Sequence, residues 1–319
     1  MTGHPLDIRV IRSRIRPSEA GVALIDHLVR RFTYRDRENW LQRIAAGELL
    51  IDGTTAAPDS LLTAGMTLEY RPTDIREPEV DTGYSICYED DLLLVVDKPG
   101  NLPTHPSGIF YAHTLWYLLT KRFGPIHLVN RLDRETSGLL LAAKDPRTAA
   151  KLARAVKEKT YLALVAGRMT EPIDADGYLI PAGSVVRKKR AFVRELPPGI
   201  SGETARTRLE PVMTGNGLSL IRATLETGRM HQIRATCCSL GYPLAGDKLY
   251  GVDETCYLRL RHGPLPPEDL ARLQMPRQAL HAARLRFIHP GHGGECDLFS
   301  PLPPDMQDLI CKSGMPRYI

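Results

Sequence analysis

An aspartate between two arginines is the strongest chemical signal in the sequence. Residues 130–138 read Asn-Arg-Leu-Asp-Arg-Glu-Thr-Ser-Gly and run directly into the apolar residues 139–143. A guanidinium close to Asp133 would lower its pKa and keep the carboxylate ionised. An ionised carboxylate held in place can act as a nucleophile or as a base. The same segment also fits a loop ion pair capped by Thr136 or Ser137, and by itself it leaves both interpretations open.

Other catalytic arrangements fit these residues poorly. Asp133 and Glu135 are two positions apart, and carboxylates with that spacing seldom converge across a sugar as a glycosidase pair does. Thr136-Ser137-Gly138 does not have the pattern of the nucleophile elbow of hydrolases. A phosphate-binding loop of the type G-x-x-x-x-G-K-[ST] is absent from the sequence.

The cysteines and histidines do not have the spacing of metal ligands. None of the six cysteines belongs to a C-x-x-C pair, and His231 near Cys237 and Cys238 lacks the spacing of a zinc site. We therefore expect no metal and interpret His231 as a structural residue.

Positive charge is concentrated near the start of the chain. Residues 9–43 contain nine arginines against four carboxylates, an excess equal to the formal net charge of +5 for the whole chain. Arginine rather than lysine suits forked contacts to phosphate and stacking on bases. A solvated helical face would give the same composition, so charge alone does not decide between the two. A second cluster at 187–190 is short enough to be only a loop.

The arginine-rich region has the pattern of two helices followed by a small sheet. Ser18 is the expected N-cap of a helix in which apolar residues recur at helical spacing up to Phe32. A second helix runs from Asp36 to a stop at Gly47, and strands follow at 49–51 and 66–70, with a turn at Asp52-Gly53. Residues 44–53 and 62–68 resemble the αL RNA-binding module of ribosomal proteins. That resemblance implies an RNA-binding module at 1–75, with phosphate contacts from Arg30, Arg31, Arg35, Arg37 and Arg43.

The rest of the chain is rich in strands. Apolar runs predict strands at 92–96, 139–143, 160–165 and 218–225, and helices are expected at 114–122 and 146–157. Strands and helices do not alternate strictly, which favours a mixed α+β fold. We expect a linker at 76–82, a catalytic domain at 83–305 and a C-terminal tail at 306–319.

Several segments, in order, resemble the RluA-type pseudouridine synthases. The match is carried by residues 88–99, 102–106, 131–139, 159–167, 228–234, 241–251 and 278–282. The resemblance implies a largely antiparallel catalytic sheet and an RNA substrate, either ribosomal RNA or transfer RNA. It implies that Asp133 is the catalytic aspartate, Tyr161 the active-site tyrosine and Arg234 the arginine paired with the aspartate. It also places Arg131 and Arg229 in position to contact RNA.

Pseudouridine formation neither adds nor removes a group, so we expect no cofactor. Tyr161 would stack on the uracil, although without the other motifs it would be interpreted as a half-buried strand tyrosine. The chain departs from the family at Asn130 and Met230, and at Ala235-Thr236 after the arginine. The alternative is a non-catalytic RNA-binding protein or RNA chaperone on a synthase scaffold.

The overall composition is that of a globular protein. Hydrophobic residues make up 43% and charged residues 25%, which excludes wholesale disorder. No apolar run reaches the roughly 18 residues of a membrane span, and residues 1–5 lack the pattern of a signal peptide. We therefore expect a cytoplasmic protein that does not bind membranes.

Overall fold

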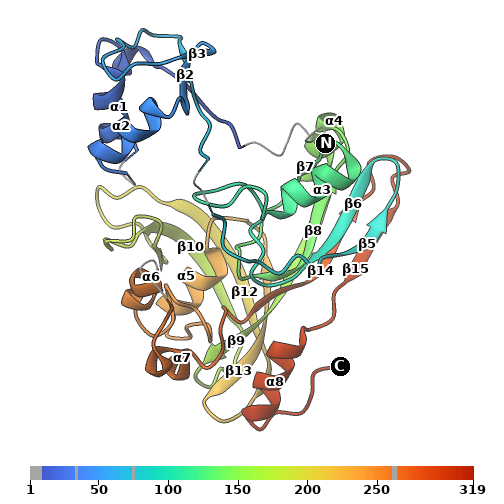
Figure 1. The fold of residues 1–319 in the computed structure, drawn as a ribbon. Helices are drawn as coiled ribbons and strands as arrows, with labels where there is room; N and C mark the ends of the chain where they lie inside the picture. Colours follow the sequence, from blue (N-terminus) through green and yellow to red (C-terminus); the bar gives the residue numbers. More distant parts are fainter. Residues whose placement is uncertain (1–8, 33–34, 74–75, 261–263) are drawn as a thin grey trace. The chain divides into compact units, whose positions relative to one another are not determined.

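The chain forms two compact units, each with its own core (Figure 1). The computed structural model describes residues 9–32, 35–73, 76–260 and 264–319. The smaller unit comprises Met1–Pro78 and Ser107–Ala112, and the larger one comprises Glu79–Pro106 and His113–Ile319. Because the placement of one unit against the other is not fixed, each is described by itself.

The smaller unit packs two helices on a four-stranded antiparallel sheet with the order β1-β4-β2-β3. Its elements are β1 (Ile11–Arg14), the 3-10 helix η1 (Pro17–Glu19), α1 (Leu24–Arg31), α2 (Arg37–Ala45), β2 (Leu49–Ile51), β3 (Thr54–Thr55) and β4 (Thr67–Tyr70). Trp40 is 1% exposed and packs edge-on against Tyr70, with ring centroids 5.2 Å apart. The turn between β2 and β3 uses Asp52 and Gly53, both with positive φ. The predicted second helix, the turn and both strands of this unit are confirmed.

The first helix begins later than predicted. Ser18 lies in η1, and α1 begins at Leu24. Gly21 has a φ of 81°, a conformation that favours glycine, and Ala23 forms a β-bridge with Leu61. The chain is therefore held extended before the helix starts, and the prediction of Ser18 as N-cap was wrong.

The larger unit is built on one mixed sheet in which the described residues contribute eleven strands. Nine strands follow the order β11-β10-β12-β13-β9-β14-β8-β6-β5, with β15 beside β14 and β7 beside β8. All pairs are antiparallel except β14 with β8. The strands are β5 (Ser85–Glu89), β6 (Leu93–Lys98), β7 (His127–Leu128), β8 (Ser137–Ala143), β9 (Val156–Ala166), β10 (Ile173–Pro181), β11 (Arg190–Val193), β12 (Glu203–Thr214), β13 (Leu218–Leu225), β14 (Leu280–Ile288) and β15 (Glu295–Phe299). The predicted α+β class and the four predicted strands are confirmed.

Helices cover this sheet in separate groups (Figure 1). They are α3 (Leu115–Phe123), α4 (Pro146–Ala155), α5 (Gln232–Ser239), α6 (Glu254–Leu260), α7 (Pro267–Leu273) and α8 (Pro304–Lys312). The two helices predicted from the sequence are α3 and α4. Each begins directly after an N-cap residue: the side chain of Thr114 accepts the N–H of Tyr117, and that of Asp145 accepts the N–H of Thr148. Helix α5 packs on β10, β11 and β12.

Two segments fall differently from the divisions made on the sequence. Residues 107–112 group with the smaller unit, where the Glu77 carboxylate accepts the N–H groups of Tyr111 and Ala112 at 2.8 Å. The terminal segment 306–319 contains most of α8, whose Met306 and Ile310 are fully buried against β9 and β13. That segment is therefore part of the core of the larger unit.

Candidate active site

Asp133 lies in the loop between β7 and β8, just before the fully buried strand β8 begins. The loop turns because the N–H of Thr136 donates to the carbonyl of Asp133 at 3.1 Å. Gly138 then pairs with Ala282 of β14 and has a φ of 105°. A Cβ at Gly138 would lie 2.3 Å from the carbonyl oxygen of Ala282, so glycine is required there. The end of the sequence motif thus anchors the aspartate loop to the sheet.

Arg234, on α5, joins two carboxylates that are far apart in the sequence. Its Nη1 donates to Asp133 Oδ2 at 2.7 Å, and its Nε and Nη2 donate to the two oxygens of Asp247 at 2.6 and 2.8 Å. Asp247 is fully buried and also accepts the N–H groups of Leu249 and Tyr250. Asp247 therefore fixes one side of the guanidinium, and the remaining nitrogen is aimed at Asp133.

These contacts keep the cluster charged. Burial alone would raise the pKa of Asp133, but the charge of Arg234 and hydrogen bonds from Arg234 and Gln278 outweigh it and lower the pKa to about 2. Burial opposes the charge on Arg234, yet Asp247 and Asp133 together raise its pKa above the ordinary value. Arg234 likewise lowers the pKa of Asp247 in spite of burial. Two carboxylates and one guanidinium are thus ionised at neutral pH.

The two oxygens of the Asp133 carboxylate have different surroundings. Oδ2 accepts from Arg234 and, at 3.3 Å, from the amide of Gln278, which is itself fixed by Thr136 at 2.6 Å. Oδ1 accepts no hydrogen bond from the part of the chain that is described, and His231 Nε2 lies 3.8 Å from it. Since 31% of the Asp133 side chain is exposed, Oδ1 is the oxygen open to a substrate.

His231 brings an imidazole beside the aspartate. Its Nδ1 lies 3.0 Å from the hydroxyl of Tyr250, which accepts the backbone N–H of Arg190 at 2.9 Å. The tyrosine proton is then available to Nδ1, which leaves the ring proton on Nε2, facing Asp133. Burial and the charge of Arg234 lower the pKa of His231 to about 4, so the ring is neutral at pH 7. The sequence interpretation of His231 as a structural residue did not foresee that it lies beside the aspartate.

Tyr161 lies on the central strand β9, paired with Ala223 of β13 and Ala282 of β14. It is 7% exposed. Burial, followed by the negative charge of Asp133, raises its pKa well above the ordinary value for tyrosine. The phenol is therefore protonated at neutral pH.

Further contacts fix the residues that follow Asp133 in its loop. Glu135 pairs with Lys248 at 2.8 Å, and Lys98, fully buried, donates to the carbonyls of Leu102 and Arg134 at 2.9 and 3.2 Å. Burial lowers the pKa of Lys98 to about 7.

Asp247 and Gln278 were not predicted as site residues, although both lie in segments that resemble the synthases. Gln278 contacts Asp133 directly and Asp247 is joined to it through Arg234, and both arrangements required the fold.

Comparison with known proteins decides the family. A family model described as RNA pseudouridylate synthase matches residues 92–239, which contain Asp133, Tyr161 and Arg234. Ribosomal large subunit pseudouridine synthase D of Pseudomonas aeruginosa is 32% identical over 92% of this chain and 93% of its own length. The chain belongs to the RNA pseudouridylate synthase family. It is a pseudouridine synthase, and the predicted resemblance to the RluA type is confirmed.

Other relatives of this synthase agree. The protein of the same name from Nitrosomonas europaea is 37% identical over 70% of this chain and 64% of its own length. Among solved structures, human RNA pseudouridylate synthase domain containing 1 is 25% identical, has a TM-score of 0.56 and covers 73% of this chain and 90% of that chain. Human RNA pseudouridylate synthase domain containing 4 shares the fold. It is 24% identical and has a TM-score of 0.52, and the match covers 72% of this chain and 93% of that chain.

The departures from the family pattern leave the cluster intact. Asn130 Oδ1 accepts the N–H of Leu141 at 2.7 Å, so this residue ties the aspartate loop to β8. Met230 is 45% exposed, and Ala235 and Thr236 are fully buried in α5. None of these substitutions removes a partner of Asp133 that the structure describes.

The predicted RNA-binding arginines of the smaller unit are mostly engaged on its surface. Arg37 pairs with Asp26 at 2.7 Å, and Arg43 lies 3.3 Å from the buried Glu48. Arg31 pairs with Glu19, and Arg30 is exposed on α1. Arg35 donates to Asn39, and the guanidinium carbon of Arg35 lies 5.9 Å from the centroid of the Trp40 ring. The helical face is therefore partly neutralised by the unit's own carboxylates.

Arg131 and Arg229 lie within five residues of Asp133 and Arg234, respectively, along the chain. Both are exposed, and Arg229 Nε donates to the carbonyl of Thr204 at 3.2 Å.

In the described part of the chain, no helix is long and apolar enough to cross a membrane. The described residues also contain no cluster of three or more His, Cys, Asp or Glu side chains that could hold a metal ion.

Proposed function

We propose that this synthase converts specific uridines of large-subunit ribosomal RNA into pseudouridine, with Asp133 as the nucleophile, and that it does so in the cytoplasm. The observation that carries the proposal is the Asp133–Arg234–Asp247 cluster, in which one carboxylate oxygen is fixed and the other is open. The names of the relatives, ribosomal large subunit pseudouridine synthases, support the choice of RNA.

The reaction is an isomerisation that needs charge at the sugar. The bond between C1′ and N1 of uracil breaks, a bond between C1′ and C5 forms, the hydrogen on C5 leaves and N1 gains a proton. Because C1′ becomes electron-poor as the first bond breaks, Oδ1 of Asp133 is suited to attack or stabilise it. Arg234 keeps that carboxylate ionised where water is partly excluded.

Tyr161 is suited to hold the uracil. Its raised pKa keeps the phenol protonated, which favours stacking on the base over removal of the C5 proton as a phenolate. A stacked nucleotide hides C1′ and C5, so the target uridine must be turned out of its helix or lie in an unpaired loop. In this proposal Arg131 and Arg229, which are both exposed, contact phosphates of the RNA.

Release of tritium from C5 tests the proposal. RNA labelled at C5 of uridine is incubated with the wild type and with Asp133→Ala, using large-subunit ribosomal RNA and transfer RNA in separate reactions. Release from ribosomal RNA by the wild type alone is expected. Release by both proteins would show that Asp133 is not the nucleophile, release from transfer RNA alone would overturn the substrate, and no release from either would favour a protein that only binds RNA.

A further inference from the structure

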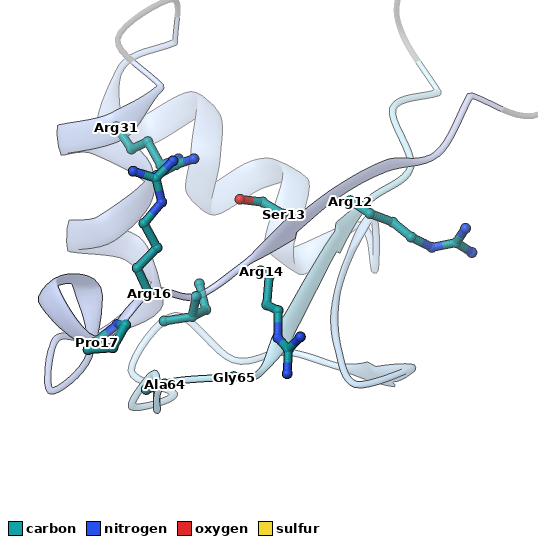
Figure 2. A pocket seen from close by; sticks show the side chains of 9 residues that line it. Arg12, Ser13, Arg14, Arg16, Pro17, Arg31, Ala64 and Gly65 are labelled. Carbon is teal, nitrogen blue, oxygen red and sulfur yellow. The ribbon is translucent and has the colours of Figure 1, made fainter. Parts of the chain in front are cut away.

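The donors around Asp133 have fixed directions, unlike the arginines of the smaller unit. A hollow of about 690 Å³ beside β1 is lined by four exposed arginines, and Figure 2 shows their side chains extending in different directions. Arg234 and Gln278, in contrast, are buried, and both donate to Oδ2 of Asp133. Oδ1 accepts no hydrogen bond from the described residues, and the ring nitrogen that faces it is His231 Nε2 at 3.8 Å.

The imidazole of His231 is itself fixed in place. The residue is the N-cap of α5 and has a φ of 59°, in the left-handed region of the backbone. Its side chain is only 7% exposed, and its ring packs edge-on against the ring of Tyr250, with the centroids 5.6 Å apart. A ring held on both sides in this way presents the same nitrogen, Nε2, to the aspartate at all times.

A chain of hydrogen bonds sets which ring nitrogen carries the proton. The backbone N–H of Arg190, the first residue of β11, donates to the hydroxyl oxygen of Tyr250 at 2.9 Å. Within the described part of the chain, the proton of that hydroxyl has one acceptor, His231 Nδ1 at 3.0 Å. Because the ring is neutral at pH 7, its own proton is then on Nε2. This Nε2–H makes no hydrogen bond with the described residues and is available to Oδ1.

We propose that His231 is a positioning residue: its Nε2–H donates to Oδ1 of Asp133 when the uridine enters, and so keeps that oxygen directed at C1′. The inference rests on the role proposed above for Asp133. A separation of 3.8 Å is longer than a hydrogen bond, and catalytic contacts are often long in the free enzyme and shorten when substrate binds. A carboxylate oxygen has two lone pairs, so Oδ1 can accept from Nε2 and still face the sugar. Tyr250 contributes by setting the tautomer.

Two substitutions in the full chain separate positioning from a structural role. The amide nitrogen of glutamine can occupy the place of Nε2, whereas that of asparagine reaches only as far as Nδ1. His231→Asn is therefore expected to lower kcat for tritium release roughly 10- to 150-fold with KM little changed, and His231→Gln to retain most of kcat. The melting temperatures should follow the reverse order, because asparagine adopts left-handed backbone angles more readily than glutamine. Equal kcat values, or a kcat order that follows the melting temperatures, would overturn the positioning role.

A matched control removes an imidazole that contacts a different carboxylate. His289 is 4% exposed, and its Nε2 lies 2.6 Å from Asp90 Oδ2. His289→Asn is expected to lower the melting temperature and to leave kcat unchanged, because no contact joins this pair to Asp133 in the described structure. A fall in kcat as large as that of His231→Asn would show that loss of a buried imidazole is enough, and would overturn the proposal.

Nitrogen NMR of the imidazole rings tests the hydrogen-bond chain without any reaction. The proton of His231 is expected on Nε2 in the wild type. Tyr250→Phe keeps the aromatic ring and removes the hydroxyl, so it is expected to give a mixture of the two tautomers. A proton on Nδ1 in the wild type would overturn the proposal whatever RNA the enzyme modifies.

The same measurements distinguish this inference from the proposed function. Release of tritium from ribosomal RNA by the wild type and not by Asp133→Ala, with equal kcat for His231→Asn and His231→Gln, would overturn only the positioning role. Release from transfer RNA alone would overturn the proposed substrate, and the two variants compared on that RNA would still decide the role of His231.

Discussion

Two arginine–carboxylate pairs show how differently the two units use the same chemistry. In the larger unit Arg234 has a side chain only 9% exposed and is held between Asp133 and the fully buried Asp247. In the smaller unit Arg37 and its partner Asp26 are 58% and 59% exposed. Buried ion pairs are rigid and costly to break, whereas exposed pairs are weak and screened by salt. Burial, rather than residue type, therefore decides whether an arginine is fixed or available.

That difference fits the work expected of each unit. An arginine that sets the ionisation of a nucleophile must not exchange partners during the reaction. An arginine that binds RNA must be able to exchange its carboxylate partner for a phosphate. An exposed ion pair allows this exchange because it contributes little free energy. Substitutions in the two units should therefore have effects of very different size.

Asp133→Asn should abolish the reaction. The amide has the shape of the carboxylate and no charge, so kcat should fall on the order of 10⁴-fold or more, as when other enzymes lose a nucleophile. Binding of RNA, measured by filter retention, should stay within a few-fold of the wild type because the arginines proposed to contact phosphates are other residues. Residual activity close to the wild-type value would remove Asp133 from the mechanism.

Arg234→Ala should destabilise the fold as well as the reaction. It leaves Asp247 charged, buried and unpaired, and the loss of one partner of such a pair costs about 3–5 kcal/mol of the free energy of unfolding. Urea unfolding measures this, with Arg37→Ala as the control from the exposed pair, for which no measurable change is expected. Equal destabilisation by both variants would break the contrast between the units.

Tyr161 separates stacking from proton transfer. Tyr161→Phe keeps the ring and should retain most of kcat/KM, whereas Tyr161→Leu should lose about 1–3 kcal/mol of stacking, or roughly 5- to 150-fold. Tritium release under subsaturating RNA measures both. If the phenylalanine variant is as impaired as the leucine variant, the hydroxyl itself takes part in the reaction.

Arg131 and Arg229 should contribute through RNA contacts alone. Alanine at either position should raise KM several-fold and lower the salt slope by about 1, with kcat little changed. A fall in kcat at saturating RNA with an unchanged salt slope would instead place the affected arginine at the reacting nucleotide.

The smallest expected effect is that of pH on kcat/KM. Contacts lower the pKa of Asp133 from 3.8 to about 2, so its ionised form contributes stability above pH 3.8, and this contribution is lost as pH falls through about 2. His231, with a pKa of about 4, stays neutral above that value. Between pH 5 and 6, kcat/KM should therefore be flat. An inflection within that interval would contradict the ionisation assigned to both groups.

Local patterns in the sequence were enough to predict most of the elements. Alternation and buried apolar runs correctly placed strands β6, β8, β9 and β13, because a strand in a central sheet needs continuous burial. The start of α1 was misplaced because the bridge between Ala23 and Leu61, thirty-eight residues apart, overrides the capping preference of Ser18. A long-range contact of this kind leaves no mark at the helix start itself.

The sequence by itself indicated which residues could carry the chemistry: an aspartate before a buried strand, a tyrosine on another predicted strand and an arginine in a third motif. Only the tertiary structure decided which oxygen of Asp133 is open, that Asp247 and Gln278 fix the cluster, and that His231 lies beside it. It also decided which N-terminal arginines have carboxylate partners and which have none among the described residues. The reason is physical: side-chain chemistry belongs to each residue, but charge neutralisation and burial depend on residues up to 145 positions away.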